Sequence, residues 1–183
     1  EENFYKEFDS PDSRSDYAYH VCAESAADIV RQSCTQTKYI EEEVDELPPG
    51  FDLYVDATGF KRKFVQDFTK MSISDYHFVD SAWVCPMEKS PNDADVTKSI
   101  ARKYGWTFEV NLQNRVGMGY IHSSSHVNKE EALKEFREIY GALNRTPLSP
   151  QGGERFIKWD PMILQNPWSD NVVAIGTSSG FVD

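Results

Sequence analysis

The 183 residues are 39% hydrophobic and include 11 Phe, 9 Tyr and 4 Trp, a composition that supports one packed domain, or part of a larger one, and excludes global disorder. The formal net charge of −11 excludes nucleic acid and anionic membrane surfaces as partners, because both require a basic footprint. No apolar run is long enough to span a membrane, and the three cysteines lack metal-ligand spacing, so we expect a cytoplasmic protein with free thiols and no metal site.

The N-terminal part of the chain predicts one helix between loops. Residues 1–16 are charged and predict a loop, while residues 17–22 favour a short strand. Apolar residues then recur at helical spacing, which predicts a helix over residues 24–36. The acidic run at residues 41–46 predicts a solvated loop, and the Pro-Pro-Gly sequence after it predicts a turn.

The middle of the chain is expected to be mostly strands. Residues 73–87 alternate loosely and predict a strand or a strand pair, whereas residues 93–104 predict a short helix. A β-hairpin is expected over residues 105–124, because apolar and polar side chains alternate strictly along its first half. We expect its turn at residues 114–119, where Asn and two Gly supply turn chemistry.

The clearest helical pattern lies at residues 127–140. Asn128 and Glu131 have the spacing of a capping box at the start of a helix. An apolar stripe at helical spacing predicts the face that packs on the core, formed by Ala132, Leu133, Phe136, Ile139 and Tyr140. Residues 145–154 then predict a loop, and residues 156–159 predict a short strand.

Two apolar strands end in small residues followed by Phe. The first is LYVDATGF at residues 53–60, and the second is VVAIGTSSGF at residues 172–181. Small residues at the carboxyl end of a strand allow the backbone to approach a flat or anionic ligand closely. The pair is typical of a cofactor that lies across strand ends, but also of two ordinary buried strands that end in tight turns.

Neither the glycines nor the histidines predict a phosphate loop or a hydrolytic centre. Gly117 and Gly119 begin a G-x-G-x-x-G pattern, but position 122 is His, and the residues that follow favour a strand rather than a helix. We therefore interpret these glycines as a hairpin turn. His122 and His126 have no third ligand nearby, and no Ser lies in a G-x-S-x-G elbow.

Three of these stretches together resemble the flavin-dependent tryptophan halogenase family. The family's D-C-S-G-F strand end is similar to residues 56–60, and its W-x-W-x-I-P signature with the following L-Q-x-R-x-G-x-G-Y run is similar to residues 106–120. Its W-x-x-N-x-V-A-I-G-x-x-x-G-F segment is matched by Trp168, Asn171, Val173, Ala174, Ile175, Gly176, Gly180 and Phe181. The resemblance covers nearly the whole chain. It implies an α+β fold like that of the flavin monooxygenases, with mixed and antiparallel strands and flanking helices.

The resemblance also implies which residues form the site. By their positions in the family motifs, the residues expected to bind FAD are Asp56, Ala57, Thr58, Gly59, Phe60, Gly176, Gly180 and Phe181. The residues expected to line a channel on the substrate side are Trp106, Phe108 and Val110. The signature departs from the family at Phe108, Val110 and Asn111, where the family has Trp, Ile and Pro.

The activity that the resemblance implies is halogenation of an electron-rich aromatic compound, such as tryptophan or another indole. A flavin reductase would supply reduced FAD, which together with oxygen converts a halide ion to hypohalous acid. That acid would pass through a closed, dry channel to a lysine that directs it onto the aromatic ring.

Several elements of the family are not found within these 183 residues. The G-x-G-x-x-G loop and the catalytic Lys lie upstream in the family, and the active-site Glu belongs to a segment that would begin at Asp183. We therefore expect residues 1–183 to be part of a halogenase domain, to be inactive alone, and to bind FAD weakly or not at all.

Two other functions remain open. The altered signature favours a different FAD-dependent monooxygenase or oxidoreductase. The missing nucleotide loop favours a non-catalytic module that keeps only the fold.

Overall fold

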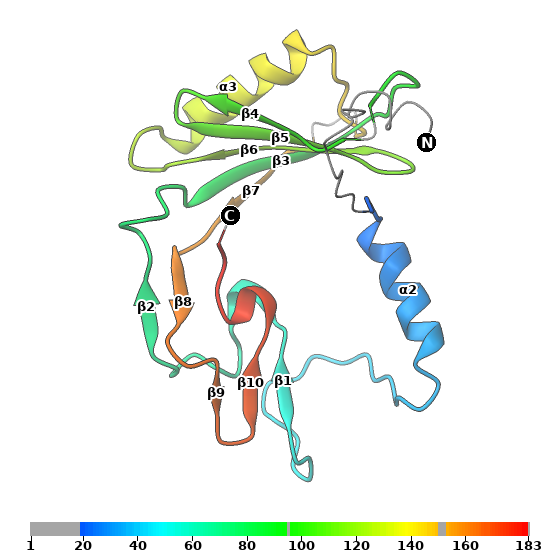
Figure 1. Cartoon of the computed structure of the whole chain (residues 1–183), viewed down its shortest axis with the longest axis vertical. Helices are drawn as coiled ribbons and strands as arrows, with labels where there is room; N and C mark the ends of the chain where they lie inside the picture. Colours follow the sequence, from blue (N-terminus) through cyan, green and yellow to red (C-terminus); the bar gives the residue numbers. More distant parts are fainter. Residues whose placement is uncertain (1–18, 95, 150–152, 183) are drawn as a thin grey trace, which may run out of the picture. The chain divides into compact units, whose positions relative to one another are not determined.

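The protein divides into two units in a computed structural model that describes residues 19–94, 96–149 and 153–182 (Figure 1). The first unit combines Glu1–Thr37 with Ser81–Ile157, and the second combines Lys38–Asp80 with Lys158–Asp183. Each unit is therefore assembled from two stretches that are far apart in the sequence.

A five-stranded sheet forms most of the first unit. In spatial order its strands are β4 (Lys98–Arg102), β5 (Gly105–Asn111), β6 (Val116–His122), β3 (Ser81–Met87) and β7 (Arg155–Lys158). The neighbours from β4 through β3 pair antiparallel. The resulting register decides which side chains share a face, and it is used below to place the candidate site.

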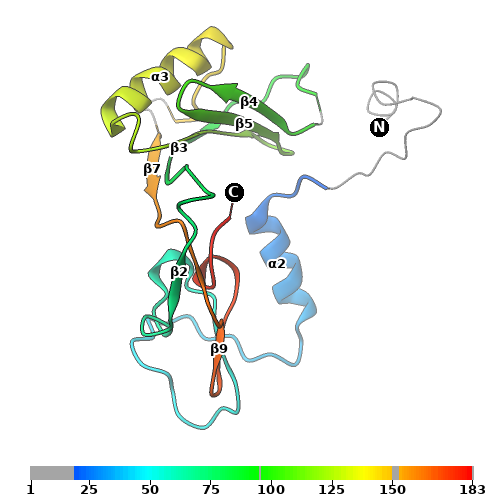
Figure 2. The same cartoon turned by 60° about the vertical axis from the view of Figure 1, so that its left-hand side comes forward.

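Helix α3 (Lys129–Ala142) covers one face of this sheet (Figure 1 and Figure 2). The Asn128 side chain accepts a hydrogen bond from the Glu131 backbone N–H at 2.9 Å, which confirms the predicted cap. The buried core between helix and sheet comprises Trp83, Cys85, Met87, Val116, Met118, Tyr120, Val127, Ala132 and Phe136. The apolar stripe predicted for this helix is therefore its packing face.

Helix α2 (Ala23–Ser33) confirms the helix predicted over residues 24–36, although it ends earlier. None of its residues is buried. Polar contacts attach this part of the chain to the hairpin: Arg115 pairs with Glu24 at 3.3 Å, and His20 Nδ1 lies 2.8 Å from the Asn111 carbonyl oxygen. The attachment of α2 to the sheet thus depends on polar contacts more than on apolar burial.

Short strands build the second unit. β1 (Tyr54–Asp56) pairs parallel with β10 (Val172–Ala174), and β10 pairs antiparallel with β9 (Trp168–Ser169). A separate antiparallel pair is formed by β2 (Lys70–Ser72) and β8 (Met162–Leu164). The small buried core contains Val65, Met162, Leu164 and Ala174. Together the two units confirm the predicted α+β class with mixed strands.

The helix predicted over residues 93–104 is wrong. Its second half is strand β4, which turns at Lys103 and Tyr104 and pairs with β5 from Gly105 onward. Pairing with a neighbouring strand outweighs a weak local preference for helix, because it satisfies the backbone groups and packs the side chains of both strands.

The predicted hairpin at residues 105–124 is confirmed, but its turn lies earlier than expected. The Leu112 backbone N–H donates to the Arg115 carbonyl at 2.9 Å, and β6 begins at the next residue. Gly117 and Gly119 are therefore inside a strand, and their interpretation as a turn is wrong.

Two other expectations concern short strands. Residues 19–22 form no strand, and residues 1–18, which include the rest of that prediction and the predicted N-terminal loop, lie outside the described residues. In the stretch 73–87, only Ser81–Met87 is a strand, and the residues before it form turns and irregular chain.

Candidate functional site

The carboxyl ends of β1 and β10 lie side by side in the second unit (Figure 1). The strands are parallel, and their register pairs Asp56 with Ala174. Each strand then leads into a single 3-10 turn, η1 (Gly59–Lys61) after β1 and η2 (Gly176–Ser178) after β10. The structure thus brings together the two small-residue stretches that lie far apart in the sequence.

Asp56 connects the two turns. Its side chain is buried, and both carboxylate oxygens accept hydrogen bonds. Oδ1 accepts from the backbone N–H and the hydroxyl of Thr58, at 2.8 and 2.7 Å, and from the Ser178 hydroxyl at 3.0 Å. Oδ2 accepts from the Phe64 backbone N–H at 2.9 Å. Because Ser178 belongs to η2, this carboxylate holds the two strand ends at a set spacing.

These contacts favour the ionised form of Asp56. Burial opposes ionisation, but the hydrogen bonds from Thr58, Phe64 and Ser178 outweigh it and lower the pKa of the carboxyl below its ordinary value. Since both oxygens are already engaged, the geometry gives Asp56 a supporting role within the predicted cofactor site.

Each of these turns begins with a glycine, and Gly176 leaves open space beside its backbone. Gly59 and Gly176 have φ angles of +68° and +58°, which a residue with a Cβ adopts only with strain. A Cβ at Gly176 would meet no atom within 4 Å, and a Cβ at Gly59 would lie 3.1 Å from Thr177 Oγ1. Ala57 is exposed nearby in the sequence. The open backbone at Gly176 fits the approach of a flat ring, which the predicted flavin contact requires.

Three aromatic rings pack together next to the turns. Phe60 stacks on Trp159 with ring centroids 6.4 Å apart, and Phe181 meets both rings edge-on at 5.5 and 5.2 Å. Gly180 lies against Ile163, where an added Cβ would come within 2.8 Å of Cγ2. Phe60, Phe181 and Gly180 are therefore packing elements of the site's outer layer.

The second predicted group, Trp106, Phe108 and Val110, lies on β5 in the first unit. Its side chains are only partly buried, and the rings of Trp106 and Phe108 have centroids 6.0 Å apart. The polar residues that alternate with them are the buried ones, with exposed fractions of 2 to 4% at Thr107, Glu109 and Asn111. The strand therefore turns its polar face to the interior and leaves its aromatic face available.

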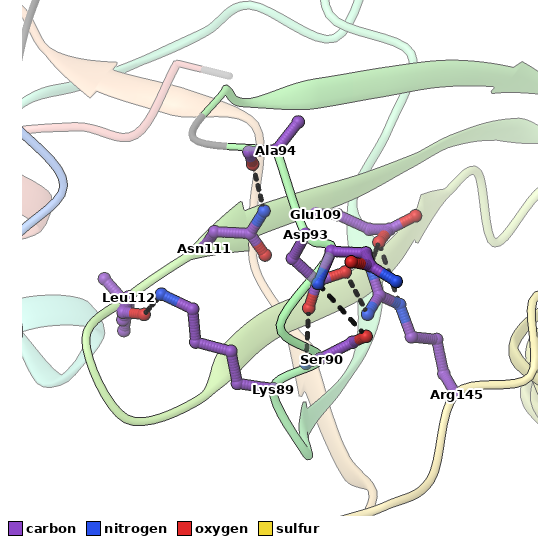
Figure 3. A network of polar contacts seen from close by, with 9 residues as sticks. Lys89, Ser90, Asp93, Ala94, Glu109, Asn111, Leu112 and Arg145 are labelled. Carbon is purple, nitrogen blue, oxygen red and sulfur yellow. Dashed lines mark hydrogen bonds and ion pairs between the residues drawn. The ribbon is translucent and has the colours of Figure 1, made fainter. Parts of the chain in front are cut away.

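An ion-pair network explains this inversion (Figure 3). Arg145 pairs with Asp93 at 2.7 Å and also with Glu109, and the three side chains are at most 10% exposed. Beside them the Asn111 amide donates to the Ala94 carbonyl. Because Arg145 supplies the positive charge, two carboxylates can be buried here.

The register places glycines under the aromatic face. Phe108 is opposite Gly119, and a Cβ at Gly119 would come within 2.5 Å of the Phe108 Cζ atom and closer still to Cε1. Gly117 lines an adjacent hollow of about 520 Å³, together with Val84, Phe108, Arg115 and Arg155. Gly119 thus makes room for the ring, and Gly117 for the hollow beside it.

Other chemistry has little support. Burial, with a contribution from the charge of Glu154, raises the pKa of the Cys85 thiol to about 11, so this thiol is protonated and unreactive at neutral pH. Within residues 19–94, 96–149 and 153–182, no group of three or more His, Cys, Asp or Glu side chains is placed to hold a metal ion. In the same part of the chain, no helix is long and apolar enough to cross a membrane.

Sequence reasoning missed three residues that shape these sites. Ser178 was visible only as one small residue in a strand-end motif, and Trp159 only as the last residue of a predicted strand. Arg145 falls in a predicted loop. The available signal for Arg145 was indirect: a strictly alternating strand with Glu109 on its polar face requires a partner if that face becomes buried.

The chain is similar in sequence to known tryptophan halogenases. It matches the family model described as tryptophan halogenase over residues 3–183. It is 28% identical to tryptophan 7-halogenase of Lentzea aerocolonigenes in an alignment that covers 92% of this chain and 36% of that protein. It is 30% identical to 7-chloro-L-tryptophan 6-halogenase of Kutzneria sp. (strain 744) over 138 residues, 72% of this chain and 26% of that protein. The chain thus spans 36% or less of the length of these relatives.

Solved structures of halogenases are also similar to this chain. A flavin-dependent halogenase from Brevundimonas sp. BAL3 is 32% identical, with a TM-score of 0.62 over 72% of this chain and 27% of that chain. One from Xanthomonas campestris is 27% identical, with a TM-score of 0.64 over 72% of this chain and 26% of that chain. A tryptophan halogenase from Shewanella frigidimarina NCIMB 400 is 23% identical and has a TM-score of 0.69 over 88% of this chain and 35% of that chain, which supports the fold alone.

Proposed function

The chain belongs to the tryptophan halogenase family, and from that premise we propose that the protein containing it is a flavin-dependent halogenase. Its substrate would be an electron-rich aromatic compound such as tryptophan or another indole, and its co-substrates reduced FAD, oxygen and a halide ion. Residues 1–183 would form part of the halogenase domain, since they span 36% or less of the relatives' length.

The proposed partner is a flavin reductase that supplies reduced FAD. None of the three cysteines is in a disulfide, which fits a reducing compartment such as the cytoplasm, where such a reductase would work.

In this proposal the strand ends of the second unit contact the flavin. Ala57, Thr58, Gly59 and Gly176 approach it through their backbone, and Asp56 holds the two turns at the required spacing. When bound, reduced FAD would activate oxygen, and oxygen would be the oxidant that converts halide to an electrophilic halogen. The support for this contact is the open backbone at Gly176.

Trp106, Phe108 and Val110 would form one wall of the channel to the substrate. The observation that carries this role is the inversion of β5, whose aromatic face is the less buried one. Large apolar side chains that are not used in the core can exclude water from a passage, and a dry passage prevents loss of the halogenating species.

The test uses the full-length protein with a flavin reductase, oxygen and chloride or bromide. Indoles, pyrroles and phenols are supplied, and products are identified by mass spectrometry. We expect a halogenated product. We expect Phe108→Ala to lower the rate at which it forms on the order of tenfold, which corresponds to an activation barrier that is higher by about 1.4 kcal/mol. Leu143→Ala, at an exposed position, is the control. If reduced FAD is consumed and none of these rings is halogenated, the proposal is wrong.

The altered signature favours a second candidate, another FAD-dependent monooxygenase. Two of its three departures, Phe108 and Val110, lie on the aromatic face, whereas Asn111 lies on the buried face and bonds to Ala94. Because Phe108 is smaller than the Trp of the family signature, this face would exclude water less completely and would permit a reaction other than halogenation. Hydroxylated product that forms equally well without halide would decide for this candidate.

A further inference from the structure

Arg62 is a buried cation that has no anionic partner within residues 19–94, 96–149 and 153–182. It follows η1 with a φ of +47° and is 6% exposed. Its Nε and Nη2 atoms are buried, and neither has a hydrogen-bond partner in the described part of the chain. Arginine does not lose its proton in proteins, so the charge stays. A buried charge left unpaired is strongly destabilising, which makes this arrangement unusual.

A shortage of carboxylates does not explain it, because the chain has 30 Asp and Glu residues and a net charge of −11. The next residue, Lys63, pairs with Asp45 at 2.7 Å although both are more exposed than Arg62. Arg145, in the first unit, is buried and pairs with two carboxylates. Among the described residues, Arg62 therefore differs from both in being buried and unpaired.

A second buried donor that lacks a partner in the described part of the chain, the Trp159 indole, lies in the same unit. Trp159 is 5% exposed, and its indole N–H has no acceptor among the described residues. Its ring stacks on Phe60, two residues before Arg62. Guanidinium and indole N–H groups can only donate, so the partner they lack is a hydrogen-bond acceptor, and the positive charge of the guanidinium favours one that carries negative charge. Asp56 does not meet this need, because both of its oxygens already accept hydrogen bonds.

We propose that Arg62 and Trp159 bind a small anion at η1. The ligand is an acceptor that carries negative charge, and it is small because both side chains are more than nine-tenths buried. Two sources share this chemistry, a free halide ion and a phosphate group. Only the choice of these two sources rests on the proposed function, since halide and the dinucleotide phosphates are what a flavin-dependent halogenase would bring to the site.

Trp159 provides the probe for the first experiment, in which iodide is titrated into the 183-residue chain. Iodide quenches exposed indoles by collision, without saturation, whereas an indole that is 5% exposed is shielded from collision. A saturable component that disappears in Trp159→Phe therefore reports iodide bound beside this ring. We expect that component in the wild type and at least a tenfold weaker apparent affinity in Arg62→Gln. Lys63→Gln, which removes the same charge one residue away, should leave it unchanged.

A second experiment measures unfolding temperature in gluconate, chloride and phosphate at equal ionic strength. In gluconate we expect Arg62→Gln to unfold at the higher temperature, because it removes an uncompensated buried charge. A binding anion should raise the wild-type unfolding temperature by about 5 °C and leave the variant unchanged. A rise in chloride alone identifies a halide site, and a rise in phosphate alone a phosphate site.

No saturable quenching, together with the same anion dependence in wild type and Arg62→Gln, would overturn the site. If Arg62→Gln does not fold, the wild type compared with Trp159→Phe still decides. Neither readout measures halogenation. Anion binding in a protein that halogenates nothing would leave this inference standing and remove the proposed function, and halogenation without anion binding would do the reverse.

Discussion

At the scale of single residues, Asp56 and Gly119 have structural roles that differ from the ligand-binding roles suggested by their motifs. Asp56 opens a cofactor-like motif, yet its carboxylate is occupied by Thr58, Phe64 and Ser178. Gly119 belongs to a glycine pair of the kind found in phosphate loops, yet it lies in a strand and accommodates the ring of Phe108. Both residues act by positioning others.

Asp56→Asn should destabilise the second unit by about 2–3 kcal/mol. Hydrogen bonds to a charged group are each worth about 1.5–3 kcal/mol, and in the variant an NH2 group replaces one carboxylate oxygen and faces a hydrogen-bond donor. Urea unfolding followed by tryptophan fluorescence measures the change. Asp67→Asn, at an exposed carboxylate of the same unit, is the matched control and should change little. Equal stability of the two variants would contradict the role assigned to Asp56.

The lowered pKa of Asp56 also predicts a pH dependence. The stabilisation it provides is fully present above the unfolded-state pKa of about 3.9 and is lost as pH falls through the lower folded-state value. The difference in stability between wild type and Asp56→Asn should therefore be constant near neutral pH and narrow below about pH 4. Unfolding curves at several pH values test this, and a difference that widens in acid would show that the sign is wrong.

Gly119→Ala should move the ring of Phe108 off the aromatic face at a cost of about 1–3 kcal/mol, the usual range for overpacking. The control is Gly117→Ala, where the added Cβ would meet only the Val110 carbonyl oxygen at an ordinary 3.7 Å. Thermal unfolding of both variants, and of Gly119→Ala combined with Phe108→Ala, measures the effect. If the clash is the cause, removing the ring should relieve most of the cost.

At the scale of elements, β5 joins the core through its polar face because the chain after α3 supplies Arg145. The network connects β5 with the loop that carries Asp93, so three separate segments depend on one guanidinium (Figure 3). Its energetic value lies less in the ion pairs themselves than in the penalty of leaving the two carboxylates buried alone.

Arg145→Met should therefore destabilise the first unit by about 3–5 kcal/mol, the range observed when one partner of a buried ion pair is removed. Lys134→Met removes the same charge from a side chain that is 79% exposed, and should have little effect. Denaturant unfolding of the two variants gives the comparison. A triple variant that also replaces Glu109 and Asp93 with Gln and Asn should recover much of the loss, which a purely steric role of Arg145 would not allow.

At the scale of the whole molecule, this chain contains the two strand ends proposed to contact a flavin but no G-x-G-x-x-G loop. The pyrophosphate of a dinucleotide is held mainly by such a loop at a helix N-terminus. The strand ends would have to offset the full entropic cost of fixing the ligand with only part of its contacts.

We therefore expect the 183-residue chain to bind FAD more weakly than about 10 μM, equivalent to about −7 kcal/mol, or not at all. Titration monitored by flavin fluorescence measures this, with the full-length protein as the positive control. Saturable quenching at low micromolar concentration would show that the strand ends hold the cofactor without the loop.

The sequence by itself determined the features that depend on neighbouring residues. Helix α3 and its Asn128 cap, the alternation along β5, and the two strand-end motifs all follow from spacing within one segment, and the same ordered motifs identify the family. Such patterns involve only neighbouring residues, so they can be recognised in the sequence without knowledge of the tertiary structure.

Only the tertiary structure decided what faces inward and what is left unpaired. Alternation shows that β5 has two faces, but the polar face is buried because Arg145, 36 residues beyond Glu109, compensates its charge. Residues 98–102 became a strand because β5 lies beside them, and Arg62 is notable only because folding buries it without a partner in the part of the chain that the structure describes. Burial and desolvation depend on contacts between distant segments, and one segment's sequence does not contain its partner.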